Sequence, residues 1–460
     1  MRKILITFHF SFLTFNFFGQ SVTQKLQKAF TAFEKDSQMK HAISSLYVID
    51  AKTGQVVFDK NSQIGLAPAS TQKIITSVTA FELLGKDYRY KTEFGIINKE
   101  SSSILCVKPS GDPTLGSWRW QSTKEQEVLK RVISSIRKTD LKNSEAVLIY
   151  AQGWNSEQIP DAWIWQDLGN YYGSGAGILN WRENQFDLVL KSGKSIGDRV
   201  EIVLLDPQLY SYQINSLATS AATGTGDNAY IYLPLDPSQA YIRGTIPVNE
   251  SRFIISGAMV NPANQFIETL ADSLKDRFKQ PRYLSSVFLN ESLNKDVKII
   301  HTEFSPALDS IIYWFNKKSI NLYGEALVKT IAYEKKGSGS TDSGVVIVQN
   351  FWKEKGLDED ELGIVDGSGL SPLNRVTTHS QVEILKYAKT KDWFPYFYNS
   401  LPEYNGMSMK SGTIRGVKGF CGYQKAKNGK EYIFSFLVNN YNGSSSSLVN
   451  KMYKVLDILK

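Results

Sequence analysis

Cysteine and histidine are scarce in this chain. Its 460 residues include two cysteines, Cys106 and Cys421, and four histidines, and none of them cluster at the close spacing of a zinc site. The glycines between 173 and 177 lack the spacing of a dinucleotide-binding loop. We therefore expect neither a metal nor another cofactor. Two cysteines so far apart define no disulfide framework, so one bond and two buried free thiols both stay open.

Long blocks of one charge are also missing. The formal net charge is +8, yet no run of lysine and arginine is longer than a pair. We therefore expect no nucleic-acid partner. Hydrophobic residues make up 42% and charged residues 21% of the chain, which is ordinary for a folded soluble protein. The chain is too long for one ordinary core, so we expect two or three domains.

Apolar runs are short except at the N-terminus. Arg2 and Lys3 precede the uncharged stretch 4–18, and small residues follow at 19–21. This pattern predicts a secretory signal over 1–21 and an exported protein in the periplasm or cell-wall compartment. A retained anchor is the alternative, although the run is near the lower limit of about 17–25 residues for a membrane span. No later segment predicts a transmembrane helix. The apolar residues of the tail 448–460 have helical spacing and predict a terminal helix packed on its own domain.

The two ends of the chain differ from its middle. Residues 45–60 predict a strand hairpin, and an apolar helix pattern from 74 to 84 ends at Gly85. Helical patterns return from about 301, and 430–438 predicts a strand after an Asn-Gly turn. The middle, 86–300, has short β-like runs and few long helical patterns. We therefore predict an α+β fold, with an antiparallel sheet covered by helices and the middle inserted as extra domains.

The pattern Ser-x-x-Lys is one candidate for nucleophilic chemistry. On a helix the two side chains lie one turn apart, and the lysine can accept the serine proton if burial or nearby cations lower its pKa. The pattern occurs at Ser37/Lys40, Ser70/Lys73, Ser135/Lys138 and Ser292/Lys295. Only Ser70 opens an apolar helix directly after a hairpin. The free N–H groups of a helix start can also stabilise an oxyanion.

Two further patterns complete a set in chain order. Lys-Ser/Thr-Gly occurs at Lys52, Lys191 and Lys410, and only the last precedes the terminal strands. In Lys410-Ser411-Gly412-Thr413, the glycine allows close approach of a substrate, while the lysine and hydroxyls can hold a carboxylate. Ser319-Ile320-Asn321 supplies a hydroxyl and an amide between two helical patterns. Ser292-Leu293-Asn294 is a competing match.

This set resembles the serine penicillin-binding proteins and β-lactamases, whose motifs are S-x-x-K, S-x-N and K-[ST]-G. More narrowly, the chain resembles the D-alanyl-D-alanine carboxypeptidase/endopeptidase family, the low-molecular-mass class C penicillin-binding proteins (peptidase family S13). The narrowing features are the long insertion and the stretches 110–115, 167–173, 179–184 and 365–371. The chain departs from the family in having Ile320 where aspartate is frequent, Ser411 where threonine is common, and Pro372 after the last stretch.

The resemblance implies a domain arrangement and roles for particular residues. It implies a transpeptidase-like catalytic domain at 22–85 and 301–460, an inserted domain II at 86–172 and 251–300, and an inserted domain III at 173–250. The implied partners are peptidoglycan stem peptides, with β-lactams as inhibitors. The implied catalytic residues are Ser70 as nucleophile, Lys73 as base and Ser319 as proton relay; Asn321, Lys410, Ser411, Gly412 and Thr413 bind substrate, and the backbone N–H groups of Ser70 and Thr413 form the oxyanion hole.

Several alternatives stay open at this point. The same acylation chemistry serves β-lactamases, and a non-catalytic β-lactam sensor or wall-binding scaffold would share the fold. A Ser-His-Asp hydrolase using His301 or His379 is a third alternative, although the G-x-S-x-G elbow is missing. The loop containing Asp366, Ser368 and Gly369 either borders the site or is a tight turn before a helix near 378. Asp112 is interpreted as a turn residue.

Overall fold

A computed structural model describes residues 20–98, 102–141, 144, 146–151, 153–154, 157–210, 212–233, 239–278, 287–288 and 297–460. All but the last two residues of the predicted signal lie outside these ranges. The competing matches at 292–295 lie outside them as well. In the described part of the chain, no helix has both the length and the apolar character needed to cross a bilayer.

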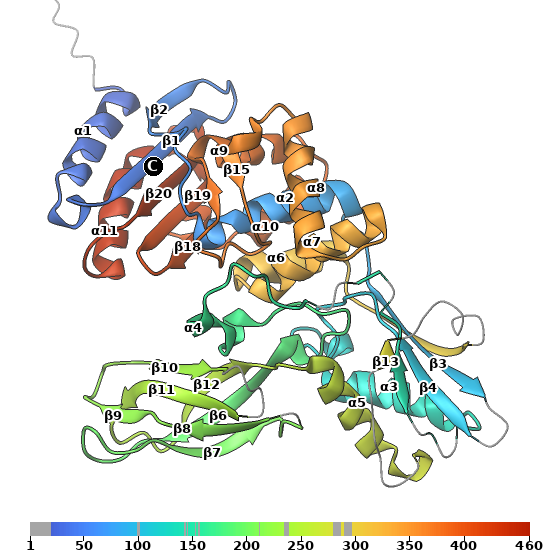
Figure 1. Ribbon diagram of the computed structural model, residues 1–460. Helices are drawn as coiled ribbons and strands as arrows, with labels where there is room; N and C mark the ends of the chain where they lie inside the picture. The colour runs from blue at the N-terminus through green and yellow to red at the C-terminus, as the bar shows by residue number, and fades with distance from the viewer. Residues whose placement is uncertain are drawn as a thin grey trace, which may run out of the picture.

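A six-stranded antiparallel sheet forms the centre of the α+β domain (Figure 1). Its strand order is β17 (Glu403–Tyr404), β18 (Met407–Ile414), β19 (Val417–Lys425), β20 (Glu431–Asn439), β1 (Ile43–Asp50) and β2 (Val56–Lys60). The hairpin predicted at 45–60 is confirmed as β1 and β2, and the predicted strand at 430–438 is β20. The two ends of the chain therefore meet, because β1 pairs with β20 along its whole length.

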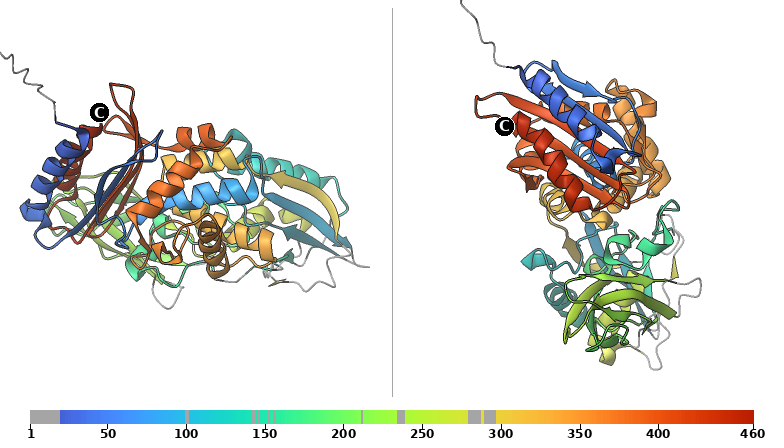
Figure 2. Two further views of the ribbon diagram at one scale, coloured as in Figure 1. Left: turned by 90° about the horizontal axis from the view of Figure 1, so that it is seen from above. Right: turned by 90° about the vertical axis from the view of Figure 1, so that its left-hand side faces the viewer.

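Helices cover both faces of this sheet (Figures 1 and 2). On one face α1 (Val22–Glu34) and α11 (Ser445–Leu456) share an apolar core with the strands. The expected terminal helix is therefore confirmed, and it packs on its own domain. The opposite face and its outer layer contain α2 (Lys73–Leu84), α6 (Leu308–Lys317), α7 (Asn321–Lys336), α8 (Thr341–Glu354), α9 (Thr378–Ala388) and α10 (Phe394–Ser400).

Helix α2 lies in the interior of the domain. Its residues from Lys73 to Phe81 are all buried, because α7 and α9 pack around it. An amphipathic surface helix would keep a polar face, so this nearly continuous burial places the start of α2 deep in the protein. Gly85 ends the helix with a φ of 84°, a conformation that favours glycine, and confirms the predicted stop.

The long insertion forms the lower part of Figure 1. One five-stranded sheet contains β13 (Val287–Phe288), β5 (Val147–Ile149), β4 (Ser103–Lys108), β3 (Lys91–Asn98) and β14 (Lys298–Phe304). Helices α3 (Glu125–Arg137) and α5 (Pro262–Ser273) share its core. We expected mainly strands here from the sequence, and these two helices were not predicted. Each buries side chains at helical spacing, such as Val128, Val132 and Ile136 in α3.

Two smaller sheets of the insertion share another apolar core. One contains β12 (Phe253–Ala258), β6 (Gln185–Lys191) and β7 (Glu201–Asp206), and the other contains β10 (Asn228–Tyr232), β11 (Gln239–Pro247), β8 (Gln213–Ser216) and β9 (Thr219–Ala221). Strand β12 pairs with β6, although the predicted border at 250/251 assigns it to the other inserted domain. We propose that this border lies nearer 258, because paired strands belong to one sheet. The other domain borders stay predictions.

The two cysteines lie in different sheets. Cys106 is in β4 of the insertion and Cys421 is in β19 of the central sheet, and both are buried free thiols. Of the two possibilities left open by the sequence, the structure has the unpaired one.

Candidate active site

Ser70 lies in a short 3-10 turn, Ala69–Gln72, directly before α2. The sequence predicted serine and lysine on one helix, whereas the serine is in this preceding turn and Lys73 is the first residue of α2. The turn is held from both sides. The Thr71 hydroxyl donates to the carbonyl of Pro68 (2.7 Å) and accepts from Gln381 Nε2 on α9 (2.9 Å). These buried bonds fix the backbone that carries Ser70.

Lys73 is fully buried beneath Ser70. Its Nζ lies 3.0 Å from Ser70 Oγ, 2.7 Å from Asn321 Oδ1 and 2.7 Å from the carbonyl oxygen of Ser368. Burial, and after it the positive charge of Lys410, holds the pKa of Lys73 well below its usual range. A lysine with a lowered pKa can be neutral near pH 7, so this amine can accept the proton of Ser70.

The second and third predicted motifs meet on the other side of Ser70. Ser319 precedes α7 in a left-handed conformation with φ of 56°, and its Oγ accepts a hydrogen bond from Lys410 Nζ (3.0 Å). Asn321 is the first residue of α7, and its Nδ2 donates to the carbonyl of Tyr172 (2.7 Å). Burial lowers the pKa of Lys410 to about 7. Two buried amines therefore contact the two serine hydroxyls, one to each.

Strand β18 runs directly beside the turn of Ser70, and Gly412 is the residue that allows this. A Cβ on Gly412 would lie 2.5 Å from the carbonyl oxygen of Pro68 and 2.9 Å from the backbone nitrogen of Ser70. No side chain larger than hydrogen fits there without a shift of the backbone. One residue later, Thr413 is exposed, and its Oγ1 accepts a hydrogen bond from Lys418 Nζ (2.7 Å).

A cleft of about 750 Å³ opens in front of these residues. The domain of the six-stranded sheet lines it with Ser70, Ser319, Asn321 and Thr413, among others. The insertion lines the opposite wall, where the cleft residues include Gln166, Asp167, Tyr171, Tyr172 and Tyr230. Lys73 and Lys410 lie buried behind the wall. Ser70, Ser319, Asn321 and Thr413 therefore line one cleft between the domain of the six-stranded sheet and the insertion, and strand β18 brings Lys410, Ser411 and Gly412 beside it.

The loop containing Asp366 has both of the properties that the sequence analysis left open. It is a tight turn ahead of α9, and it also reaches the site, because the Ser368 carbonyl accepts from Lys73. Asp366 is buried and holds the loop together as a hydrogen-bond acceptor. Its donors are Gln72 Nε2, Trp163 Nε1, Asn374 Nδ2 and the backbone N–H groups of Gly369 and Ser371. Asp112 accepts from the N–H of Thr114 two residues on, which confirms it as a turn residue.

Two residues near the site were not found from the sequence. Glu325 lies one turn after Asn321 on α7, is fully buried, and accepts from the backbone N–H of Gly367 (3.0 Å). Burial, and then the charge of Asp366, raises the pKa of Glu325 to about 8. An acidic residue four positions after Asn321 in an apolar helix was the available signal. Lys418 is the other residue, and its position follows only from the pairing of β19 with β18.

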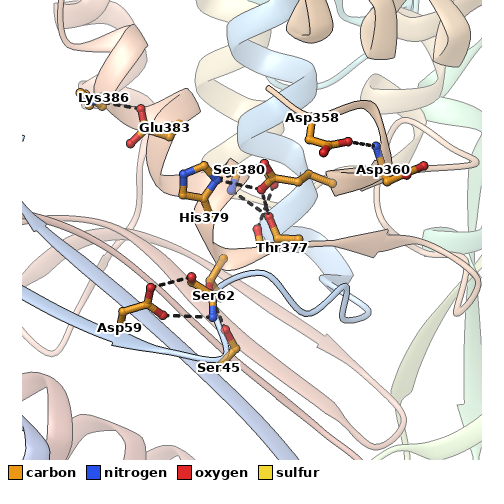
Figure 3. Close-up of polar contacts among 12 residues, drawn as sticks. Ser45, Asp59, Ser62, Asp358, Asp360, Thr377, His379, Ser380, Glu383 and Lys386 are labelled. Carbon is orange, nitrogen blue, oxygen red and sulfur yellow. Dashed lines mark hydrogen bonds and ion pairs between the residues drawn. The ribbon is translucent and has the colours of Figure 1, made fainter. Parts of the chain in front are cut away.

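The histidines occur in contacts away from the cleft. His301 contacts Ser135 Oγ (3.2 Å) and Glu303 (2.6 Å), but Arg131 holds the Glu303 carboxylate with two hydrogen bonds. His379 pairs with Glu361, which also accepts a hydrogen bond from Thr377 (Figure 3). Neither histidine lines the cleft at Ser70. The arrangement therefore gives no support to a Ser-His-Asp mechanism.

The sequence is similar to a known family of proteins. A sequence profile of the D-Ala-D-Ala carboxypeptidase 3 (S13) family matches residues 26–403. The D-alanyl-D-alanine carboxypeptidase of Actinomadura sp. (strain R39) is 25% identical, over 92% of this chain and 82% of that protein. The D-alanyl-D-alanine carboxypeptidase DacB of Haemophilus influenzae is 23% identical, over 84% of this chain and 83% of that protein.

The fold also matches a solved structure. Penicillin-binding protein 4 (dacB) from Haemophilus influenzae superposes with a TM-score of 0.77 at 19% sequence identity, over 91% of this chain and 96% of the other. A second structure of that protein, in complex with a β-lactam, has a TM-score of 0.74. The match extends over the insertion as well as the catalytic domain, so the whole architecture is shared.

Proposed function

The chain belongs to the D-Ala-D-Ala carboxypeptidase 3 (S13) family, and on that premise we propose that it is a serine-type D-Ala-D-Ala carboxypeptidase. Its substrates are peptidoglycan stem peptides, and the reaction proceeds through an acyl-enzyme on Ser70. The relatives that match over most of the chain are named D-alanyl-D-alanine carboxypeptidases. The observation that carries the proposal is the 3.0 Å contact between Ser70 Oγ and the buried amine of Lys73.

The acylation step uses the Ser70 hydroxyl as the nucleophile and the Lys73 amine as the base. Ser70 Oγ attacks the carbonyl carbon of the penultimate D-alanine, and its proton passes to the neutral Lys73 Nζ. The negative charge that develops on the carbonyl oxygen is stabilised by the backbone N–H groups of Ser70 and Thr413. The close packing of Gly412 on the turn supports this assignment, because it brings β18 beside the nucleophile.

The leaving group needs a proton when the peptide bond breaks. Ser319 supplies it to the amine of the terminal D-alanine, and Lys410 Nζ, 3.0 Å from Ser319 Oγ, replaces it. Lys410, Ser411 and Thr413 hold the terminal carboxylate, while Asn321 orients the peptide. Water then attacks the Ser70 ester and releases the shortened peptide. A β-lactam acylates the same serine and leaves it slowly, which agrees with the β-lactam complex solved for the Haemophilus influenzae protein.

The location of the protein is part of the proposal. The basic start and apolar stretch at 2–18 support export, and peptidoglycan is outside the cytoplasmic membrane. We place the mature protein in the periplasm or cell-wall compartment, with its N-terminus near residue 21.

Release of D-alanine from an N-acylated D-Ala-D-Ala peptide tests the function. The wild type should release D-alanine, and Ser70→Ala should lose activity by a factor on the order of 10⁶. Ser37→Ala is the matched control, because Ser37 has the same Ser-x-x-Lys pattern but is exposed and does not line the cleft at Ser70. It should retain wild-type rates. Equal turnover by Ser70→Ala and the wild type would refute the assignment.

A further inference from the structure

Lys418 is a buried lysine that no motif in the sequence singled out. It lies on β19 directly opposite Thr413 on β18, and its Nζ donates a hydrogen bond to Thr413 Oγ1 at 2.7 Å. The residue is 9% exposed, and its ammonium group is 4.8 Å from the centroid of the Phe420 ring. The ring and the strand therefore hold the ammonium in one place beneath Thr413.

The bond to Lys418 determines what the Thr413 hydroxyl can do. An ammonium group only donates, so the threonine oxygen must be the acceptor and its own proton points elsewhere. Thr413 lines the cleft. The described residues offer no acceptor in hydrogen-bond contact with this proton. The hydroxyl is thus kept as a donor on the cleft side, at the position where a bound anion would lie.

The charges around the site also indicate an anionic ligand. Lys410 and Lys418 are both buried, and neither ammonium is within ion-pair distance of a carboxylate anywhere in the described ranges. Burial lowers the pKa of both lysines, and the charge of Lys418 lowers the pKa of Lys410 further. Buried charges are costly unless an opposite charge compensates them. An anion in the cleft supplies that compensation.

We propose that Lys418 is a positioning residue for the terminal carboxylate of the substrate, acting through the Thr413 hydroxyl. It orients that hydroxyl as a donor and adds a second positive charge behind it. The proposal rests on the carboxypeptidase function given above, and it extends the recognition of the carboxylate from the Lys410 motif to the neighbouring strand. It makes Lys418 important for acyl donors that end in a carboxylate and unimportant for donors that lack one.

The test compares two acyl donors on the same set of variants. One donor is an N-acylated D-Ala-D-Ala peptide, and the other is the p-nitrophenyl ester of an N-acylated D-alanine, which has no carboxylate. Lys418→Met keeps the packing on Phe420 and removes the charge and the donor. Lys418→Gln keeps a neutral donor. Lys425→Met removes a lysine from the exposed end of the same strand and is the matched control.

For Lys418→Met we expect kcat/KM for the peptide to fall about 10- to 100-fold, mainly through KM, since a charge-assisted hydrogen bond is lost. The ester rate should stay within about twofold of the wild type, and Lys418→Gln should be intermediate on the peptide. Thr413→Val should cause a similar loss, and the double variant should lose no more than the larger single loss, because both changes remove one interaction.

Each other result has a definite meaning. An equal loss on both donors makes Lys418 merely structural and overturns the proposal, as does a peptide rate that Lys418→Met leaves unchanged. Additive losses from Lys418 and Thr413 overturn the coupling between them. If Lys418→Met does not fold, Lys418→Gln carries the same comparison. A wild type that acts on neither donor refutes the carboxypeptidase function itself, which is a different failure and is visible without any variant.

Discussion

Gly412→Ala tests how closely β18 must approach the turn that carries Ser70. The added methyl group would lie 2.5 Å from the Pro68 carbonyl oxygen, 2.8 Å from the Thr71 nitrogen and 2.9 Å from the Ser70 nitrogen. All three are backbone atoms of a turn that buried hydrogen bonds hold in place. A rotating side chain cannot relieve these contacts, so the strand or the turn must move.

The size of that movement follows from the distances. Ordinary contacts of a Cβ begin near 3.4 Å, so relief of the 2.5 Å contact requires a displacement of about 0.9 Å. The oxyanion donors work at roughly 2.7–3.1 Å, and a misplacement of about 1 Å costs on the order of 10²-fold in rate. We therefore expect Gly412→Ala to slow both D-alanine release and acylation by penicillin about 100-fold.

The assay pairs this variant with Gly363→Ala. Gly363 also lies in a strand, but a Cβ there meets no atom closer than 3.6 Å. Stopped-flow acylation by a chromogenic β-lactam gives the rate, and thermal denaturation checks that both proteins are folded. The control should acylate at the wild-type rate. If folded Gly412→Ala acylates within about twofold of the wild type, the tight approach of β18 is not needed for catalysis and the reasoning is wrong.

Three further predictions follow from the same contacts. Asp366→Asn should lower kcat more than it raises KM, because the loop whose Ser368 carbonyl contacts Lys73 loses its carboxylate acceptor; steady-state kinetics of D-alanine release measure this split. The kcat/KM for D-alanine release should fall as pH rises through about 7, because Lys410, with a pKa of about 7, loses the charge that holds the substrate carboxylate. The hydrogen bond to Glu361 raises the pKa of His379 (Figure 3). The stability that this pair contributes is therefore complete below the pKa that His379 has in the unfolded chain, and it is lost as pH rises through the higher pKa of the folded protein. The Tm of His379→Gln should therefore lie further below the wild type at pH 6 than at pH 9.

Local patterns were sufficient to predict the elements that carry the site. The helix after Ser70, the helix near 378 and the hairpin at 45–60 all depend on neighbours in the sequence, and each is confirmed. The predicted helix start directly after a hairpin also distinguished Ser70 from Ser135, which has the same Ser-x-x-Lys pattern. In the structure Ser135 lies inside a helix of the insertion, beside His301. Helix α3 had a clear helical pattern of its own, and its omission was an error in weighing the β-like runs around it.

Local sequence patterns could not predict the contacts between segments that are far apart in the sequence. Lys418 reaches Thr413 only because of the register between β18 and β19, and no spacing rule predicts that register. The Asp366 carboxylate accepts hydrogen bonds from Gln72 and Trp163, which are far from it in the sequence. These bonds form only because α2 and the insertion pack around Asp366. Burial of this kind is a property of the assembled core.

The most direct test of the central claim is the intact mass of the mature protein after incubation with benzylpenicillin, followed by peptide mapping. We predict one stable adduct, located on Ser70, and no adduct on Ser70→Ala. An unmodified protein that hydrolyses penicillin rapidly would contradict the carboxypeptidase assignment in favour of a β-lactamase. An unmodified protein without hydrolysis, or an adduct on another residue, would contradict the role of Ser70 as the nucleophile.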